Sequence, residues 1–355
     1  YMASSINLEF YFSPDQLQQA YWDHKEAKTD LYNINKIKIP IGADGVTYEV
    51  FEKQLVRNTH EISKKVLSGK YLFYPLREVE IPKANNTKRK LSIARLRDVI
   101  VQKQLYQALY TRCEDWFSQG VLDRVSVAYR KGKSAHDAIR GITKARDEGF
   151  DYVLDADIQK FFDELNHQRM LDVIGRLLGD QYPIPYKLLK RYLKTDYVPF
   201  HVYENIKLTD RLRYFATNKP IRRIRQIGVP QGGVLSGMLA NLYLHEFDNW
   251  LVNDVGRNID LRYYRYADDF VVLTKSHDDA VRIFEQIEAK LESAFKLKIH
   301  PLETKSHILY LPETSLKFVG FQVTNQDVRI HPKNISKFKE NFKESIKWQK
   351  IKDRS

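Results

Sequence analysis

Residues 261–274 read LRYYRYADDFVVLT, and this stretch decides the fold because it predicts two strands joined by a very short turn. Leu261–Tyr266 and Phe270–Thr274 are rich in aromatic and β-branched residues, which favour strands. The turn between them carries two adjacent acids, Asp268 and Asp269. Aspartate is common in turns, so the pair alone indicates no more than a hairpin. Its surroundings give it further meaning.

Working outward from the hairpin, the chain alternates strands and helices from residue 150 onward. Tyr152–Ile158 alternates as a strand, and Asp278–Phe295 has an apolar stripe typical of an amphipathic helix. We expect further elements as a helix at 167–178 and strands at about 307–310 and 317–323. Setting aside residues 180–227 and a helix at 234–251, the order is β-α-β-β-α-β. That order predicts an α+β fold with a ferredoxin-like sheet.

This sheet would bring three carboxylates together. Its two central strands are neighbours, so Asp157, at the end of the strand 152–158, faces the turn that holds Asp268 and Asp269. Clustered carboxylates repel one another unless cations neutralise them. Hard divalent ions with oxygen ligands, Mg²⁺ above all, are their natural partners.

Composition points to a polyanionic partner. The 355 residues carry a formal net charge of +13, which suits nucleic acid, although a generally basic surface is an equal alternative. The single cysteine, Cys113, excludes an internal disulfide framework and a cysteine-rich zinc module. No apolar run approaches the ~18 residues of a membrane span, and no secretory segment is visible at the start, so we expect a cytoplasmic protein without membrane contact.

The box Tyr266-Ala267-Asp268-Asp269 in this context resembles the catalytic box of reverse transcriptases. The resemblance runs from about residue 42 to 322, and further stretches follow that family's order. They are Ile81-Pro82-Lys83 with Arg89-Lys90-Leu91, Ser134–Ile139, Leu154–Ile158 with Phe161-Phe162-Asp163, Gly228–Ser236, Lys305 and Phe318–Phe321. The forms of Ser134–Ile139 and Gly228–Ser236 are similar to those of the group II intron-like bacterial lineage.

The resemblance implies a two-metal nucleotidyl transfer. Asp157, Asp268 and Asp269 would be the catalytic residues, with Asp157 and Asp268 binding both Mg²⁺ ions and Asp269 in support. The carbonyl of Ile158 would be a further ligand, and Mn²⁺ could substitute for Mg²⁺. Asp155 shares a strand face with Asp157, but its spacing does not match the family's ligand, so we expect it outside the ligand set.

The same resemblance assigns residues to the incoming dNTP. The assigned residues are Lys83 and Arg89 on the triphosphate, Phe162 as a steric gate against a 2′-hydroxyl, Gln231 and Gly232 beside the nascent base pair, and Lys305 as proton donor to pyrophosphate. The alternatives are solvated charge for the first pair, core packing for Phe162, and an ordinary helix-entry turn at Gln231. The order Thr304-Lys305 reverses the family's usual order, which puts the exact lysine in doubt.

The implied architecture is a right-hand polymerase. Residues 1–150 would form an N-terminal extension and helical, hairpin-bearing fingers, 151–179 the first part of the palm, 180–227 a basic insertion on the fingers side, and 228–315 the rest of the palm. Residues 316–355 would hold the primer grip, Phe318, Val319, Gly320 and Phe321, and the start of a helical thumb. Arginines among tyrosines and phenylalanines in the insertion suit single-stranded RNA or a partner surface, with a solvated basic loop as the alternative.

The expected activity is RNA-directed DNA polymerisation with an RNA template, a DNA or RNA primer and dNTPs. Divergent features such as Gly237 favour antiviral defence with a dedicated non-coding RNA, and intron-type retrohoming and CRISPR spacer acquisition are alternatives. A non-catalytic splicing cofactor disagrees with the three retained aspartates, and an RNA polymerase disagrees with Phe162. A protein partner or a homo-oligomer stays open.

Overall fold

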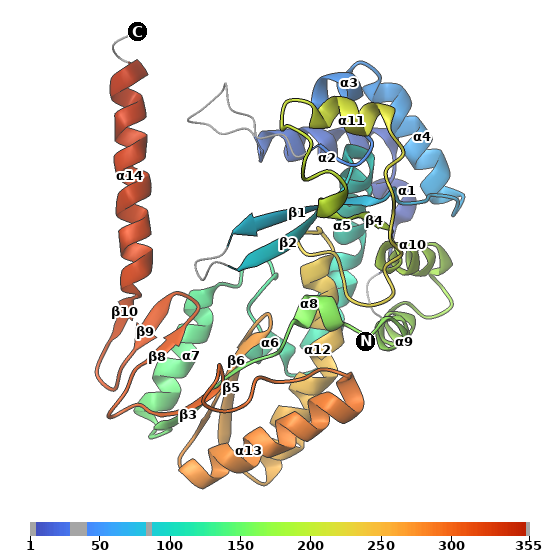
Figure 1. The fold of residues 1–355 in the computed structure, drawn as a ribbon. Coiled ribbons are helices and arrows are strands. Elements are labelled where there is room, and N and C mark those ends of the chain that lie inside the picture. The colour runs from blue at the N-terminus through green and yellow to red at the C-terminus, as the bar shows by residue number, and fades with distance from the viewer. Residues whose placement is uncertain (1–4, 29–40, 83–86, 353–355) are drawn as a thin grey trace. The chain divides into compact units, whose positions relative to one another are not determined.

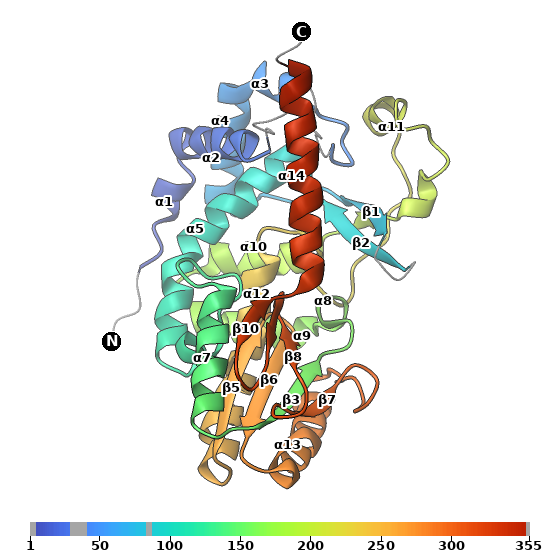
Figure 2. The ribbon, with the colours of Figure 1, turned by 90° about the vertical axis from the view of Figure 1, so that its left-hand side faces the viewer.

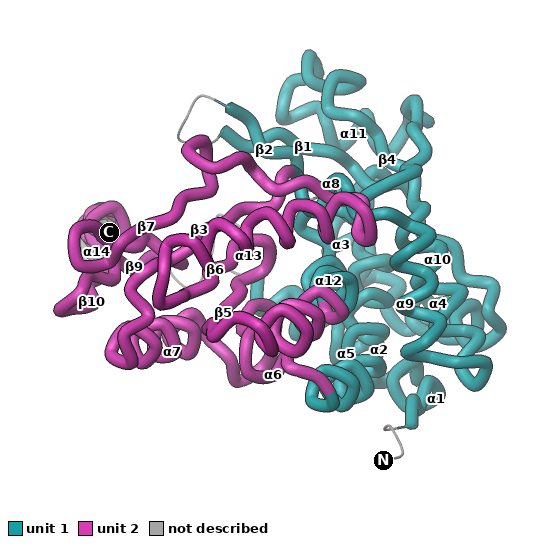
Figure 3. The backbone as a smooth tube through the Cα atoms, turned by 90° about the horizontal axis from the view of Figure 1, so that it is seen from below, with its two compact units in different colours: residues 1–119, 160–244 teal, residues 120–159, 245–355 magenta. Residues whose placement is uncertain are grey.

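The computed structural model describes residues 5–28, 41–82 and 87–352 and divides the chain into two compact units (Figure 3). Unit 1 comprises residues 1–119 and 160–244, and unit 2 comprises residues 120–159 and 245–355. Each unit is described by itself.

Unit 2 is built on one antiparallel sheet of four strands (Figure 1). The strands are β3 (Tyr152–Asp157), β5 (Leu261–Tyr266), β6 (Asp269–Thr274) and β7 (His307–Tyr310). Their order across the sheet is β5-β6-β3-β7, so β3 lies between β6 and β7. The first and third strands in chain order are therefore the central neighbours, as the β-α-β-β-α-β pattern predicts.

Helices cover both faces of this sheet. On one face, Ile139 and Ile142 of α7 (Ala135–Asp147) pack with Val153 of β3 and Val271 of β6. On the other face, the rings of Tyr263 and Phe270 contact Phe247 of α12 (Ser236–Asn253). Helix α13 (His277–Lys290) and the turn of π-helix η3 (Leu291–Phe295) follow β6, and they include Phe295, whose ring also contacts Phe247. Alternate residues of each strand therefore enter two different apolar layers.

A second, smaller sheet ends unit 2 (Figure 2). It consists of β8 (Leu316–Phe318), β9 (Phe321–Val323) and β10 (Val328–Ile330), and helix α14 (Pro332–Lys352) follows it. Leu316, Phe318 and Val323 are buried in the same core as Val153 and α7. Short elements at the start of unit 2 and before β5 are α6 (Leu122–Val125) and η2 (Val255–Arg257).

Unit 1 is mainly helical around the long α5 (Leu96–Ser118). The remaining helices are α1 (Leu8–Tyr11), α2 (Pro14–Glu26), α3 (Tyr48–Glu52), α4 (Leu55–Leu67), α8 (Phe161–Glu164), α9 (His167–Leu178), α10 (Pro183–Leu193), η1 (Phe200–Val202) and α11 (Arg211–Thr217). A hairpin of β1 (Leu76–Pro82) and β2 (Lys88–Ile93) is extended by β4 (Tyr197–Val198), which is parallel to β1.

Residues 180–227 contain α10, β4, η1 and α11. The expectation that this stretch has no clear period is wrong for α10, whose buried residues 185, 188, 189, 192 and 193 have the spacing of an amphipathic helix. Arginine–aromatic contacts hold these short elements, with Arg211 over Tyr203 and Arg225 over Tyr197. Part of the basic and aromatic composition of this segment is therefore used in its own packing. Within the described ranges, none of the helices has both the length and the apolar character needed to cross a bilayer.

Candidate active site

The carboxylates predicted from the sequence lie at one end of the unit 2 sheet. Asp157, the last residue of β3, is paired directly with Asp269, the first residue of β6. Asp268 occupies the two-residue turn after Tyr266, and Tyr266 pairs with Asp269 to close the hairpin. Two like charges directly across a sheet are unfavourable unless something neutralises them.

A fourth carboxylate, that of Asp155, interacts electrostatically with this group. Burial raises the pKa of Asp155 to about 7, and the charge of Asp157 adds to the shift. The pKa of Asp269 is also raised to about 7, by desolvation and then by the charges of Asp268, Asp157 and Asp155, while Lys305 opposes the shift. The charges of neighbouring carboxylates therefore add to the desolvation that raises the pKa values of Asp155 and Asp269.

The oxygen donors of these carboxylates are of the chemical kind that hard divalent cations prefer. Within residues 5–28, 41–82 and 87–352, however, no group of three or more His, Cys, Asp or Glu side chains is arranged so that it could hold a metal ion. The fit therefore rests on the mutual repulsion of oxygen donors, which a doubly charged ion relieves. The side chain of Ile158 is buried, and its backbone bridges Ile299, next to the strand end.

Two basic side chains approach Asp157 within unit 2. Nζ of Lys305 and Nε2 of His300 each lie 3.7 Å from Oδ2 of Asp157, and they lie 3.2 Å from one another. The backbone N–H of His300 donates to the carbonyl of Asp157 at 3.0 Å, which fixes this segment beside β3. Lys305, assigned from the sequence, is thus close to Asp157. The Lys305 side chain is 62% exposed, so its ion pair with Asp157 is a weak one.

A second group of predicted residues comes together within unit 1. Nε of Arg89 donates to Oε1 of Gln231 at 3.2 Å, and Nε2 of Gln231 donates to both carboxylate oxygens of Asp163 at 2.9 Å. The backbone carbonyl of Gln231 accepts from the N–H of Ser92 on β2. This chain of contacts links the β1–β2 hairpin to the turn that contains Gly232. Lys83 lies outside the described residues.

Phe162 differs from its neighbour Phe161. Phe161 is buried, whereas Phe162 is half-buried and its ring meets Phe161 edge-on at 5.3 Å. The carbonyl of Phe162 accepts from the N–H of Val229 at 2.7 Å. At Gly228, where φ is 77°, a Cβ would stand 2.6 Å from the Asp163 carbonyl oxygen, so only glycine permits this approach.

The predicted primer-grip residues form the β8–β9 turn. Phe318 pairs with Phe321, and Val319 and Gly320 between them have φ of 43° and 87°, as in a type I′ hairpin. Phe318 is buried, and the ring of Phe321 meets His136 edge-on at 5.1 Å.

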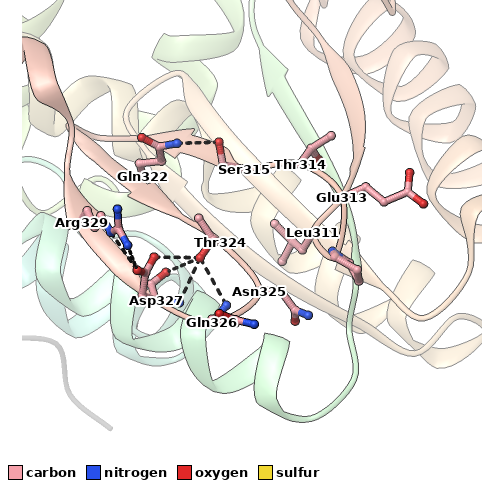
Figure 4. Close-up of a pocket in the computed structure, with 11 residues that line it drawn as sticks. Leu311, Glu313, Thr314, Ser315, Gln322, Thr324, Asn325, Gln326, Asp327 and Arg329 are labelled. Atoms are coloured by element: carbon pink, nitrogen blue, oxygen red, sulfur yellow. Dashed lines mark hydrogen bonds and ion pairs between the residues drawn. The ribbon is translucent and has the colours of Figure 1, made fainter.

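A cavity of about 490 Å³ lies beside this small sheet, between residues 311–315 and the β9–β10 turn (Figure 4). Several of its polar groups satisfy each other, since Thr324 and Arg329 both donate to Asp327 at 2.8 Å. The cavity contains none of the residues that the sequence assigned to chemistry.

Two residues near the predicted carboxylates, Asp155 and His300, were not assigned to the site from the sequence. Asp155 was set aside because of its spacing, although residues two apart on a strand share a face. His300 gave no signal, because its position depends on the pairing of Ile158 with Ile299.

The mixed α+β fold matches that of a solved telomerase structure. Telomerase from Candida tropicalis, truncated from its C-terminal domain, superposes with a TM-score of 0.55 at 14% identity, over 73% of this chain and 55% of that chain. At this identity the likeness concerns the mixed α+β fold alone. The sequence identifies the family: residues 81–323 match the profile described as reverse transcriptase (RNA-dependent DNA polymerase). The chain therefore belongs to the reverse transcriptase family, which is a family of enzymes.

Two relatives with similar sequences illustrate which proteins this chain resembles. Protein YkfC of Escherichia coli K12 is 28% identical over 299 residues, which cover 74% of this chain and 71% of YkfC. The group II intron-encoded protein LtrA of Lactococcus lactis subsp. cremoris is 25% identical over 341 residues, covering 79% of this chain. The match spans 51% of LtrA, so this chain corresponds to about half of that relative's length.

Proposed function

We propose that this chain is the polymerase part of a reverse transcriptase that extends a DNA or RNA primer with dNTPs on an RNA template. The carrying observation is the pairing of Asp157 with Asp269 beside the Asp268 turn, with two pKa values raised to about 7. Such a set of oxygen donors at a strand end suits hard divalent cations, Mg²⁺ above all.

Asp157, Asp268 and Asp269, with the Ile158 carbonyl, would hold two Mg²⁺ ions, and Mn²⁺ could replace them. When bound, the ions supply activation of the primer 3′-hydroxyl and charge stabilisation at the leaving pyrophosphate. The protein positions the reactants and donates protons. Nζ of Lys305 lies 3.7 Å from Oδ2 of Asp157, and Lys305 is the candidate proton donor to pyrophosphate.

The incoming nucleotide would be recognised by residues of unit 1. Arg89 offers a bidentate fork to a phosphate, and Lys83 would add a point charge. The half-buried ring of Phe162 suits a gate that excludes a 2′-hydroxyl, and Gln231 with Gly232 would flank the new base pair. In this proposal residues 151–179 and 228–315 form the palm, the β1–β2 hairpin belongs to the fingers, and residues 316–355 supply the Phe318–Phe321 primer grip and, with α14, the start of the thumb.

Primer extension tests the proposal. We expect Mg²⁺-dependent dNTP incorporation on an RNA template, little rNTP incorporation, and a loss of at least about 100-fold in kcat for Asp268→Asn. Asp260→Asn is the matched control, because Asp260 precedes the same hairpin and pairs with Arg262 at the surface. Equal use of rNTPs, or activity that survives Asp268→Asn, contradicts the assignment.

The biological role is a separate proposal. The antiviral-defence role rests on divergent positions such as Gly237, whereas the likeness to a group II intron-encoded protein favours an intron-type role. CRISPR spacer acquisition is a third possibility within the same activity. Sequencing the RNA that co-purifies with the protein separates the roles: a group II intron transcript contradicts defence, and a short dedicated non-coding RNA supports it.

A further inference from the structure

A buried ion pair lies directly behind the turn that carries Asp268. Arg265 is on β5 and Asp248 is on α12, and both side chains are 0% exposed. Nε of Arg265 donates to Oδ1 of Asp248 at 2.9 Å, and Nη2 donates to Oδ2 at 2.6 Å. The hydroxyl of Tyr263 donates to the same carboxylate at 2.7 Å. The guanidinium thus makes a two-point contact whose geometry lysine cannot reproduce.

The pair also reaches the turn itself. Nη1 of Arg265 donates to the carbonyl oxygen of Ala267 at 2.9 Å, one residue before Asp268. Ala267 has φ of 61°, a left-handed conformation that is unfavourable for an alanine. The backbone carbonyl of Arg265 accepts from the N–H of Val127, so the strand end is held as well. The turn therefore keeps an unfavourable conformation with a charged donor fixed on its carbonyl.

Stability alone does not explain why two charges are buried here. Replacing a buried ion pair by apolar side chains of similar size is often neutral or stabilising. Burial by itself would lower the pKa of Arg265, but the charge and hydrogen bonds of Asp248 raise it above its ordinary value, so the guanidinium stays charged. What an apolar replacement cannot supply is the donor to Ala267.

We propose that Arg265 is a positioning residue for polymerisation: held by Asp248 and Tyr263, it fixes the Ala267 carbonyl and thereby the direction in which Asp268 presents its carboxylate. This inference rests on the proposed function, because the turn matters only if Asp268 takes part in the chemistry. Arg265 does not touch the reacting atoms, so its loss lowers kcat while template–primer affinity stays unchanged.

The first test replaces Arg265 by lysine. We expect Arg265→Lys to lower kcat by about 10-fold to 100-fold, since small misplacements of catalytic groups have effects of this size. The dissociation constant of template–primer, measured in EDTA, stays unchanged, and the rise in Tm that Mg²⁺ produces becomes smaller. Arg262→Lys is the matched control on the same strand, because Arg262 pairs at the surface with Asp260 and Glu148. Its kcat stays within about twofold of the parent.

The second test separates positioning from folding. The triple variant Arg265→Met, Asp248→Leu, Tyr263→Phe removes both charges and the hydroxyl that would otherwise lose its acceptor. We expect it to fold with a Tm near that of the parent and to keep the low kcat of Arg265→Lys. Parental kcat in either variant overturns the inference. If the unmodified protein incorporates no dNTP, the proposed function fails instead, so the two failures are distinguishable.

Discussion

At the scale of single residues, Asp269 lies among three other acidic residues, Asp155, Asp157 and Asp268. Its pKa of about 7 lies above the ordinary value of 3.8, so between these two pH values the carboxyl is protonated in the folded chain and ionised in the unfolded chain. Stability without metal should therefore be full below about pH 4 and fall as pH rises through 7. We expect Asp269→Asn to raise Tm in EDTA at pH 8 by about 1–3 °C, an effect kept small because this residue is exposed, and to reduce activity.

Thermal unfolding in EDTA at several pH values measures this effect. The difference in Tm between Asp269→Asn and the parent should shrink as pH falls from 8 to 4, because the folded parent's Asp269 carboxyl becomes protonated and therefore neutral like the asparagine. In the parent, Mg²⁺ should recover the stability lost at pH 8, because it neutralises the same repulsion. A difference in Tm that is constant with pH would show that the asparagine acts through packing and not through charge.

Also at the scale of single residues, substitution of Phe162 tests how the protein selects the sugar of the incoming nucleotide. Its ring lies edge-on to the buried Phe161 and is itself only half-buried, so its exposed part would limit the space beside a nucleotide. We expect Phe162→Ala to reduce the preference for dNTPs over rNTPs by about 10-fold or more, while Phe162→Tyr, which keeps the ring, preserves it. Single-nucleotide incorporation with matched dNTP and rNTP gives both ratios. An unchanged ratio in Phe162→Ala would return Phe162 to a packing role.

At the scale of elements, the β8–β9 turn fixes the start of α14. The carbonyl of Gly320 accepts from the N–H of His331 at 2.9 Å and from Nδ2 of Asn334 at 3.1 Å. A Cβ on Gly320 would stand 2.5 Å from that Nδ2, and φ is 87°. We expect Gly320→Ala to cost about 2–3 kcal/mol in the free energy of unfolding, and to expose the start of α14 to protease.

Gly149→Ala provides the control for this turn. Gly149 also has a positive φ, of 83°, but no described atom lies within 4 Å of its added Cβ. Its cost should be the backbone strain alone, about 1 kcal/mol. Equal costs for the two substitutions, measured by denaturant unfolding, would mean that Asn334 moves aside and does not anchor the helix.

The elements that the sequence predicted well are those with a clear period. The order of β3, β5, β6, β7 and α13 follows from alternating apolar residues and one amphipathic stripe, and the strand pairing then follows from topology. Within residues 180–227, α10 has an apolar period that sequence reasoning could have used, whereas contacts such as Arg225 on Tyr197 have no sequence period. The placement of Asp157, Asp268 and Asp269 at one end of the sheet follows from the predicted topology, whereas Asp248 and His300 come near them only through tertiary contacts.

At the scale of the whole molecule, the net charge of +13 predicts a strong effect of salt on nucleic-acid binding. Each phosphate that a lysine neutralises releases a counterion, so affinity falls steeply with salt concentration. On α14, Lys337, Lys339 and Lys343 are exposed. If they follow the template–primer backbone, Lys→Gln at all three should weaken binding and flatten the slope of log affinity against log salt by about 2–3.

The control for the α14 variant is Lys→Gln at Lys53, Lys64 and Lys65, which are exposed lysines after α3 and on α4 and change the net charge equally. Titration of labelled template–primer across a salt series compares the two sets. A flatter slope only for the α14 variant assigns the charge excess to a binding surface, and equal slopes would reduce it to a general property of the surface.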